Sequence, residues 1–449
     1  MSKEKIENEK LEDSSLAAPR GTRDFLFEEK ILRDEVTSTL KTIFELYGFN
    51  AFETPAFEKW EVLSSKYAGG AEILKETYRF QDQGKRELGL RYDLTVPLCR
   101  VIAGNSSLPL PVKRYAIGSV FRDGPLKIGR YREFIQCDVD IVGSKTGLAD
   151  AEIVSLTCDA FTALGIDYVV KVNNRKLLEG LLESMQVPAN KLETVILSID
   201  KLAKIGRDGV QKELLEKGLS IPIAKKLLSV ILELSELRAD QVLFQCEKII
   251  GQNAKAKQGL TEMKEVFDFL DNFGKTDAVV LDISLARGLA YYTGLVVEVF
   301  AKNSEVKSSI AGGGRYDELI GKFANREAIP AVGISFGLDA INEVLKLQDK
   351  GAKPKKTLVS VYVIPIKAIP QCISVANQLR AAGIRTAIDL MNRSISKNLE
   401  YASKQGINYV AIIGPKEAEA KKLTLRNLET GEEKLMTIAD TIMLISRSN

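Results

Sequence analysis

Apolar residues recur at helical spacing near the start of the chain. Between Leu32 and Tyr47 they fall three or four positions apart, and Gly48 follows as a stop signal. This spacing predicts a helix over 32–47. The helix leads into the run Phe49–Phe57, which contains Pro55.

Strand-like segments separated by turn residues lie on both sides of a long helical stretch. Neighbouring segments of this kind predict an antiparallel sheet, and a helix is predicted to follow them from Leu338 to Leu347. The predicted strands are Glu76–Gln81, Leu88–Tyr92, Val112–Phe121, Phe134–Val142, Ala278–Ile283, Leu295–Phe300, Val306–Ala311 and Gly333–Gly337.

The stretch Asn173–Gly274 is helical in pattern almost throughout. It carries two apolar stripes at helical spacing, one from Leu177 to Met185 and one from Ile223 to Leu232. We interpret it as a helical domain inserted into the sheet domain. Core packing explains both stripes, so they receive no chemical role.

The pattern changes after Gln348–Lys356, which has the composition of a linker. Beyond it, strands alternate with helices, and this alternation predicts a small α/β domain. The predicted strands are Leu358–Ile364, Thr386–Leu390, Tyr409–Ile413 and the hairpin Leu423–Thr437, and the helices are Ile373–Leu379, Ser396–Ser403 and Ala439–Ile445.

Composition is typical of a soluble globular protein, with 45% hydrophobic and 27% charged residues. No apolar stretch approaches the roughly 20 residues that span a bilayer, so no membrane association is expected. The charged N-terminus lacks a secretory signal pattern and is predicted to be a disordered tail. The five scattered cysteines and the absence of histidine give no zinc spacing, so no metal site is expected. A reducing cytoplasm is the expected compartment.

Charge is unevenly distributed along the chain. Residues 355–449 hold 14 Lys and Arg against 8 Asp and Glu, a net charge of +6, which leaves −3 for the rest because the total is +3. A basic C-terminal domain is compatible with a polyanionic partner. A basic solvated surface is the simpler alternative.

A cluster of basic residues lies in the segment SVFRDGPLKIGRYREFIQCDVD, residues 119–140. Arg122 and Arg130, with Lys127 and Arg132, can clamp phosphates or carboxylates between two strands. Gln136 and Asp140 lie four residues apart and share one face of the second strand. Together they suit a ligand with N–H donors. The alternative interpretation is that the segment is a charged hairpin exposed to solvent.

Upstream, LGLRYDLTVPLCR places Asp93 and Thr95 on one face of a predicted extended segment. Asp93 is a candidate to bind an α-ammonium group, with Thr95 beside it. The alternative is capping at the end of a strand.

Two downstream segments combine glycine, arginine and tyrosine. In RGLAYYTG, residues 287–294, one of Tyr291 and Tyr292 is expected to face a pocket, and Arg287 needs an anionic partner. Aromatic core packing is the alternative. In AGGGRYDEL, residues 311–319, three glycines allow close approach to a ligand before Arg315 and Tyr316. The segment does not have the spacing of a Walker loop. A glycine-rich turn between elements is the alternative interpretation.

Together these segments resemble class II aminoacyl-tRNA synthetases, specifically the histidyl-tRNA synthetase family. RGLAYYTG is similar to the family signature RGLDYYTG, and GGGRYD is similar to its second signature. Phe49–Phe57 resembles motif 1, Phe121–Asp140 motif 2 and Gly333–Asp339 motif 3. The likeness extends from about Pro19 to the C-terminus.

The resemblance implies an α+β fold, with an antiparallel-sheet catalytic domain, a helical insertion and a C-terminal α/β anticodon-binding domain. The expected boundaries are 1–18 for a disordered tail, 19–172 and 275–347 for the two parts of the catalytic domain, 173–274 for the insertion, 348–357 for a linker and 358–449 for the anticodon-binding domain.

The resemblance also implies roles for individual residues in histidine binding. Asp93, Leu94 and Thr95 would hold the amino group, and Gln136 would approach the backbone or the imidazole. Asp140 and one of Tyr291 and Tyr292 would read the two imidazole nitrogens, a pattern that fits a neutral imidazole with one donor and one acceptor. Tyr316 would line the same pocket.

By the same resemblance, Arg122 and Arg287 would be the catalytic residues. Arg122 would bridge the histidine carboxylate and the ATP α-phosphate, and Arg287 would stabilise the charge that grows on that phosphate. Arg130 would reach the distal phosphates.

The implied reaction joins L-histidine to ATP, with Mg²⁺ on the phosphates, and then transfers the histidyl group to tRNA(His). The C-terminal domain would bind the anticodon stem-loop and the insertion would contact the acceptor arm. Motif 1 implies a homodimer.

Three positions depart from the family pattern. Ala340 replaces the motif 3 arginine, and Arg315 is the expected substitute at the γ-phosphate. Gly124 replaces the motif 2 glutamate, and Ala290 replaces an aspartate of the first signature.

Other functions are compatible with parts of this pattern. A non-catalytic histidine-binding regulatory subunit of ATP phosphoribosyltransferase shares the catalytic fold, but it usually lacks the anticodon domain. A class II synthetase for another amino acid would tend to use zinc or lack RGLxYYTG. An RNA-binding scaffold would not consume ATP.

Overall fold

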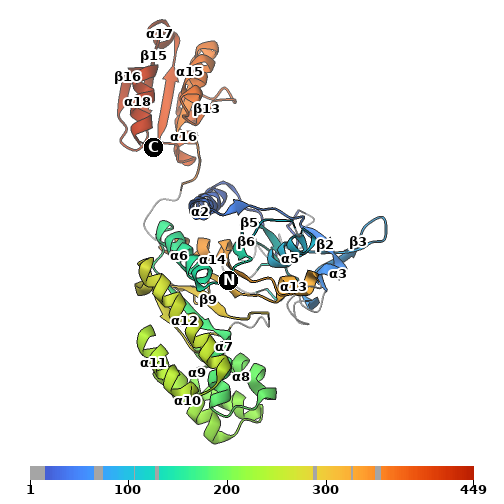
Figure 1. The fold of residues 1–449 in the computed structure, drawn as a ribbon. Helices are drawn as coiled ribbons and strands as arrows, with labels where there is room; N and C mark the ends of the chain where they lie inside the picture. The colour runs from blue at the N-terminus through green and yellow to red at the C-terminus, as the bar shows by residue number, and fades with distance from the viewer. Residues whose placement is uncertain are drawn as a thin grey trace, which may run out of the picture. The chain divides into compact units, whose positions relative to one another are not determined.

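The computed structural model of the protein describes residues 16–64, 74–105, 107–126, 131–286, 291–324, 327–348 and 355–448. The described residues form two compact units. The first lies within Met1–Asp24 and Val36–Lys350, and the second within Phe25–Glu35 and Gly351–Asn449. Figure 1 traces both units from the N-terminus to the C-terminus.

An eight-stranded sheet forms the centre of the first unit. Neighbouring strands are antiparallel except for the pairs β1–β5 and β7–β8 at the two ends. The prediction of an antiparallel sheet is confirmed. In sheet order the strands are β1 (Asn50–Ala51), β5 (Val112–Phe121), β6 (Glu133–Val142), β11 (Ala331–Gly337), β10 (Ala311–Arg315), β9 (Leu295–Ala301), β7 (Tyr168–Asn174) and β8 (Val279–Leu281).

Aromatic packing joins two helices to one face of this sheet. The Phe336 ring of β11 contacts Phe44 from one helix and Phe161 from another, with centroids 5.5 Å apart in both pairs. Aromatic pairs at this distance and tilt are favourable beyond the area they bury. The helices are α2 (Phe27–Leu46) and α6 (Gly147–Ala163), and α14 (Leu338–Gln348) packs on β6 and β11.

A second apolar cluster forms where helix α5 meets helix α13. It contains Leu98, Cys99, Ile102, Leu319 and Ile320, all of them buried. A small three-stranded sheet and one short helix complete this region. The elements are α5 (Thr95–Gly104), α13 (Leu319–Ala324), β2 (Phe57–Lys59), β4 (Glu87–Leu90), β3 (Arg79–Gln81) and α3 (Trp60–Leu63).

Helices fill the chain between β7 and β8. Two of them cross closely because glycine lies at the contact: a Cβ on Gly180 would be 2.5 Å from Ala256 Cβ, and one on Gly259 would be 2.3 Å from Leu177 N. Figure 1 shows α12 extending along α6 and α7. The helices are α7 (Arg175–Ser184), η1 (Ala189–Lys191), α8 (Leu192–Ile199), α9 (Leu202–Glu216), α10 (Ile221–Ser235), α11 (Ala239–Ile250), α12 (Ala254–Asn272) and η2 (Thr276–Ala278).

The helical segment begins two residues later than predicted. Asn173 and Asn174 belong to β7, and the Asn174 side chain accepts hydrogen bonds from the N–H groups of Lys176 and Leu177. Asparagine is a favoured N-cap because its oxygen satisfies helix N–H groups that otherwise lack partners. The domain boundaries themselves stay predictions.

The second unit contains a five-stranded mixed sheet with helices on both faces, as an α/β domain requires. Val361 and Val363 face one apolar core, while Tyr362 and Ile364 face another, which is the two-residue alternation of a strand buried on both sides. In sheet order the strands are β13 (Thr386–Ile388), β12 (Val361–Pro365), β14 (Tyr409–Ile413), β15 (Lys422–Asn427) and β16 (Glu433–Thr437). The helices are α15 (Ile369–Ala381), α16 (Ile395–Lys404), α17 (Pro415–Glu419) and α18 (Ile438–Ser448).

Three sequence predictions need correction or fall outside the described residues. The strand predicted over Val306–Ala311 is wrong, because the strand is β10 and runs through the glycines that follow. Helix α6 was not predicted: most of its residues are buried, so it lacks the polar face that reveals a surface helix. The tail predicted over 1–18 lies outside the described residues as far as residue 15, and so does most of the linker.

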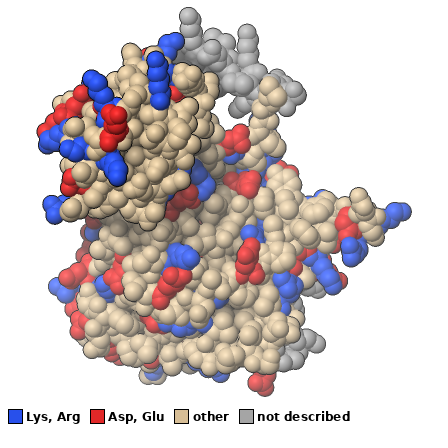
Figure 2. Space-filling view, turned by 90° about the horizontal axis from the view of Figure 1, so that it is seen from above, with Lys and Arg blue, Asp and Glu red and all other residues tan. Residues whose placement is uncertain are grey.

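The described helices include none that is both long and apolar enough to cross a membrane. On the face that Figure 2 shows, Lys and Arg side chains are interspersed with Asp and Glu side chains. The visible surface charge is therefore mixed in sign.

Candidate functional site

A cavity of about 530 Å³ opens above the middle of the eight-stranded sheet. This volume lies in the range of small-molecule sites. Strands β6, β10 and β11 supply most of the wall. The lining residues are Glu76, Tyr92, Asp93, Thr95, Arg122, Phe134, Gln136, Asp138, Asp140, Tyr291, Tyr292, Ser309, Ile310, Ala311, Gly312, Gly313, Gly314, Tyr316, Gly333, Ile334, Ser335 and Gly337.

Strand β6 presents a row of polar side chains to the cavity. Gln136, Asp138 and Asp140 alternate along the strand, so they share one face, as predicted for the first and last of them. On β11 their cross-strand partners are Gly337, Ser335 and Gly333. These partners are small, and that leaves space above them. A Cβ on Gly333 would lie 2.0 Å from Asp140 Oδ1, so glycine is required beside that carboxylate.

A buried cationic side chain holds Asp140 in place. Arg114 is 1% exposed, and its Nη2 lies 2.6 Å from Asp140 Oδ2, outside hydrogen-bond alignment but in close ionic contact. The same Nη2 donates to the carbonyl of Leu94 at 3.2 Å. The Tyr316 hydroxyl donates a hydrogen bond to Asp140 Oδ1. Both oxygens of Asp140 are thus engaged by the protein.

The segment before helix α5 carries Asp93 and Thr95 into the cavity wall. The predicted extended conformation is wrong at Thr95, which begins α5, but both residues line the cavity. The backbone N–H of Val96 donates to Asp93 Oδ1 at 2.9 Å. Leu94 does not line the cavity: its side chain packs with Ala116, and its carbonyl accepts from Arg114.

Both members of the tyrosine pair face the cavity. The prediction that one points inward and the other outward is wrong, because Tyr291 and Tyr292 lie in a turn rather than in a strand. Their ring centroids are 4.7 Å apart, and Tyr291 meets Tyr316 edge-on at 6.2 Å. The three rings form a continuous aromatic wall.

The glycines of β10 are needed for close approach of the backbone. A Cβ on Gly313 would lie 2.0 Å from the Gly333 carbonyl oxygen. Gly314 has φ +157°, and a Cβ there would lie 2.4 Å from the Leu295 carbonyl oxygen. The glycines therefore form a thin strand rather than a turn. The cavity owes its depth to that strand.

A different set of groups lines the part of the cavity near motif 2. The Arg122 guanidinium carbon lies 4.9 Å from the centroid of the Phe134 ring, a cation–π contact, and Arg122 Nε donates to the Tyr92 carbonyl at 3.1 Å. The Asp123 N–H donates to the Glu76 carbonyl at 2.7 Å. The Glu76 carboxyl carbon lies only 2.9 Å from where a Cβ on Gly124 would be.

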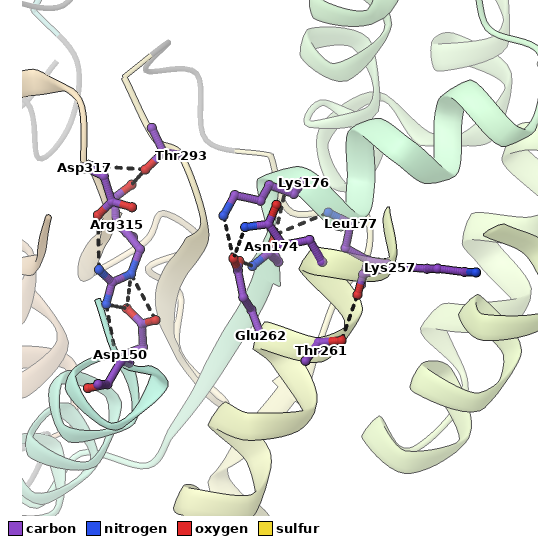
Figure 3. A network of polar contacts seen from close by, with 12 residues as sticks. Asp150, Asn174, Lys176, Leu177, Lys257, Thr261, Glu262, Thr293, Arg315 and Asp317 are labelled. Atoms are coloured by element: carbon purple, nitrogen blue, oxygen red, sulfur yellow. Dashed lines mark hydrogen bonds and ion pairs between the residues drawn. The ribbon is translucent and has the colours of Figure 1, made fainter. Parts of the chain in front are cut away.

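Arg315 does not line the cavity. It is 4% exposed, and its Nε donates to both oxygens of Asp150 at 3.0 and 3.1 Å. Its other donors bond the carbonyls of Ser144 and Thr146 and the carboxylate of Asp317, as Figure 3 shows in part. All three guanidinium nitrogens are engaged, since Nη2 also lies 2.9 Å from Asp150 Oδ1. The expected γ-phosphate contact is not supported, because Arg315 instead ties β10 to helix α6.

Two of the predicted arginines, Arg287 and Arg130, lie outside the described residues. Nothing in the structure tests their roles. Lys127 and Ala290 lie outside as well.

Three aspartates that line the cavity are costly to ionise because they are buried. Burial raises the pKa of Asp138 to about 7, against the opposing charge of Arg114, and burial raises the pKa of Asp93 to about 6. Burial also raises the pKa of Asp140, although Arg114 and the Tyr316 hydrogen bond act in the opposite direction. Perturbed acids that converge in one cavity are a mark of a functional site.

The site can therefore bind two kinds of group. The carboxyl, amide and phenol groups of β6 and the tyrosines suit an amino acid with N–H donors. Arg122 and Phe134 suit an anion joined to an aromatic ring.

Sequence reasoning missed several polar contributors, among them Glu76, Asp138, Ser335 and Arg114. Asp138 shares the face of Gln136 and Asp140, so the same two-residue spacing could have revealed it. Arg114 stands opposite Asp140 on β5, which only the strand register shows.

Comparisons with known proteins agree with this geometry. Residues 21–341 match the family model described as histidyl-tRNA synthetase, and residues 360–447 match the one described as anticodon binding domain. A histidine–tRNA ligase from Bacillus cereus is 43% identical over 419 residues, which is 92% of this chain and 96% of the relative. One from Aeropyrum pernix is 41% identical over 96% of this chain and 97% of its own length. The crystal structure of histidyl-tRNA synthetase from Nostoc sp. PCC 7120 is similar with a TM-score of 0.87 and 32% identity, over 97% of this chain and all of that one.

The structural role of Arg315 can be tested directly. Arg315→Met should lower the free energy of unfolding by about 3–5 kcal/mol, because it leaves Asp150 buried without its partner. The affinity for ATP, measured by calorimetry on the folded protein, should not change. The matched control Lys322→Met removes an exposed cation and should change stability by less than about 0.5 kcal/mol. Unchanged stability with weaker ATP binding would restore a phosphate role for Arg315.

Proposed function

The chain belongs to the histidyl-tRNA synthetase family, and we propose that the cavity bounded by β6, β10 and β11 is its site for histidine and ATP. It is a class II aminoacyl-tRNA synthetase that ligates histidine to tRNA. The observation that carries the proposal is the division of one cavity between acidic and amide side chains on β6 and the Arg122–Phe134 pair beside motif 2.

Histidine binds at the acidic part of the cavity. Asp93 and Thr95 hold the α-ammonium group at the start of α5, and Leu94 contributes only by fixing Arg114 through its carbonyl. Asp140 and the tyrosines at 291 and 292 face the imidazole, with Tyr316 and Gln136 completing the pocket. An amino acid whose side chain has no hydrogen-bond donor would leave buried acceptors of this pocket unpaired. The unpaired acceptors are a strong basis for rejecting such an amino acid.

ATP binds beside Arg122 and Phe134. The Phe134 ring offers a face for the adenine base, and the Arg122 fork bridges the histidine carboxylate and the α-phosphate. Arg130 at the distal phosphates and Arg287 at the reacting phosphate are proposed from the family resemblance alone.

Two transfers make up the reaction. An oxygen of the histidine carboxylate attacks the α-phosphorus, the bond to the β-phosphate oxygen breaks, and pyrophosphate leaves. A ribose hydroxyl at the tRNA terminus then attacks the histidyl carbonyl carbon, and AMP leaves. Arg122 stabilises negative charge in the first transfer by being in place before the charge develops.

Mg²⁺ enters as part of the ATP substrate. It usually takes most of its ligands from phosphates and water and needs only one or two carboxylates. The described residues include no cluster of three acidic, cysteine or histidine side chains placed to hold a metal.

The anticodon-binding domain and the helical segment indicate how the protein binds tRNA. The anticodon-binding domain, with its excess of positive charge, takes the tRNA(His) anticodon stem-loop, and the helices between β7 and β8 contact the acceptor arm. We place the protein in the cytoplasm, which cell fractionation would test.

An alternative is a regulatory histidine-binding subunit of ATP phosphoribosyltransferase. It would bind histidine without forming an adenylate. The match of residues 360–447 to an anticodon-binding domain favours the synthetase.

The first prediction concerns catalysis. The protein should exchange pyrophosphate into ATP with histidine alone among the amino acids, and it should charge tRNA(His). Arg122→Ala should lower exchange at least about 100-fold, because one preorganised donor at the developing charge is worth that much. Arg238→Ala, an exposed arginine on the helical segment, is the matched control and should be active. Histidine binding without any exchange in the wild type would instead support the regulatory subunit.

A second prediction concerns adenine recognition. We propose that the Glu76 carboxylate accepts a hydrogen bond from the adenine 6-amino group. It would replace the motif 2 glutamate that Gly124 lacks, since the Glu76 carboxylate lies where a side chain at position 124 would begin. Glu76→Ala should raise the KM for ATP by roughly 10-fold, the cost of one hydrogen bond to a charged group. It should leave the KM for purine riboside triphosphate, which lacks the amino group, nearly unchanged.

The reciprocal swap is the control for this prediction. Gly124→Glu alone should impair the enzyme, because its Cβ would displace the Glu76 carboxylate from the position proposed for adenine recognition. In Glu76→Ala/Gly124→Glu the preference for ATP over purine riboside triphosphate should return. Equal losses with both nucleotides in Glu76→Ala would refute a contact with the amino group.

A third prediction concerns assembly. We propose that the motif 1 region forms a homodimer, since β1 is the outer strand of the large sheet and the Phe57 side chain is 53% exposed. Phe57→Asp should convert the dimer into a monomer in sedimentation velocity. Phe244→Asp changes an equally exposed ring on α11 and should leave the dimer intact. A monomeric wild type would contradict the proposal.

A further inference from the structure

One carboxyl group in the cavity wall has no place in the roles assigned above. Asp138 lies on β6 between Gln136 and Asp140, and it is 3% exposed. Its cross-strand partners are Ala116 on β5 and Ser335 on β11. It lines the cavity with its two neighbours.

Asp138 and Asp140 differ in what satisfies them. Asp140 contacts Arg114 through one oxygen and Tyr316 through the other. Asp138 Oδ1 is buried and has no hydrogen-bond partner among the described residues. A hydrogen bond involving Ser335 favours the ionised form of Asp138.

A purely structural explanation would make Asp138 a second counter-ion for Arg114. The hydrogen bonds do not support it. Arg114 Nε and Nη1 also have no hydrogen-bond partner among the described residues, so Asp138 makes no bond to either of them. A buried acceptor without a partner is unfavourable, and such groups persist where a ligand completes them.

The neighbours of Asp138 form a fixed support. Gln136 Nε2 donates to Ser335 Oγ at 3.0 Å, and Ser335 lies directly across from Asp138. Asp138 is more deeply buried than Asp93, which stands at the start of α5. Along β6, Phe134 beside Arg122 is followed on the same face by Gln136, Asp138 and Asp140, so a substrate whose α-carboxylate reaches Arg122 has its side chain toward Asp138 and Asp140.

We propose that Asp138 is a specificity-determining residue that accepts a hydrogen bond from the imidazole N–H of histidine through Oδ1. This inference rests on the proposed function, since it requires that the cavity bind histidine. The imidazole N–H donates this hydrogen bond to Asp138 Oδ1, and no proton is transferred. Asp140, whose two oxygens are engaged by Arg114 and Tyr316, then shapes the pocket and does not accept the same N–H. A five-membered ring without an N–H leaves the Asp138 carboxylate buried and unpaired.

The ionisation of Asp138 supports this assignment. Burial raises its pKa to about 7, while Arg114 from β5 and Ser335 from β11 oppose the rise, and Asp140 and Asp93 add to it. Burial therefore favours the protonated carboxyl in the ligand-free protein. An N–H donor favours the ionised form.

The test compares histidine with β-(2-thiazolyl)alanine, whose ring has no N–H. Calorimetry would give both dissociation constants at pH 8 for the wild type and for Asp138→Asn, which keeps the side-chain volume. The variant should weaken histidine binding by about 10- to 100-fold, the range for a hydrogen bond to a charged group. Binding of the thiazole should change less than 3-fold.

Thermal unfolding supplies a readout that separates substrate recognition from a structural role. The folded pKa of Asp138 lies above its ordinary value, so ionising this carboxyl destabilises the folded protein. The contribution of Asp138 to the free energy of unfolding therefore falls as the pH rises from 4 to 7. Ligand-free Asp138→Asn should therefore have a higher Tm than the wild type at pH 8, and the difference should shrink toward pH 4. The matched control is Asp282→Asn, a buried aspartate bonded to Lys171 outside the cavity, which should lower the Tm.

The outcomes are distinguishable. If Asp138→Asn weakens histidine and thiazole equally, or lowers the Tm at pH 8, Asp138 has a structural or backbone-binding role and the inference is wrong. If the wild type supports histidine-dependent exchange but the variant binds histidine normally, only this inference fails. If the wild type binds no histidine, the proposed function fails and this inference fails with it.

Discussion

The buried contact between Arg114 and Asp140 is the constraint on which the site depends. One guanidinium on β5 reaches a carboxylate on β6 and a carbonyl before α5, and the carboxylate in turn accepts a hydrogen bond from Tyr316 after β10. Four segments that are distant in sequence thus meet at one ion pair. Breaking either partner would leave the other charge buried, which makes the arrangement intolerant of substitution.

The glycines of β10 and β11 give the Arg114–Asp140 contact the space it needs within the sheet. Asp140 has room for its carboxylate because Gly333 stands opposite, and β10 lies close to β11 because Gly313 has no Cβ. Arg315 then fixes the end of β10 to α6 through Asp150. Two buried arginines, Arg114 and Arg315, therefore hold the strands that bound the cavity, and neither is among the residues that line it.

Sequence patterns predicted the strands whose side chains alternate and whose ends carry turn residues. Strands β5 and β14 have the predicted bounds, and β6 begins one residue earlier. The pattern was misleading where local preference and tertiary structure disagree. Glycine disfavours strands, so the run before Ala311 seemed the better strand, whereas the sheet required the glycines themselves. Helix α6 escaped because burial around most of its surface removes the amphipathic signal.

The site shows the same division between local pattern and tertiary context. Family signatures located Asp93, Gln136 and Asp140 because these residues lie in recognisable segments, and all three line the cavity. The expectation that Arg315 substitutes for the motif 3 arginine is not supported, since a residue's place in the sequence does not reveal the bonds that already occupy its side chain.

The buried polar atoms of the cavity connect stability with selectivity. Gln136 Oε1 and Asp138 Oδ1 line the cavity and are buried acceptors without hydrogen-bond partners among the described residues. An interior that leaves such groups unpaired is less stable than one that pairs them. A ligand that supplies the missing partners recovers this free energy, and one that lacks them does not. The same atoms that weaken the empty protein therefore give it the means to distinguish its substrate.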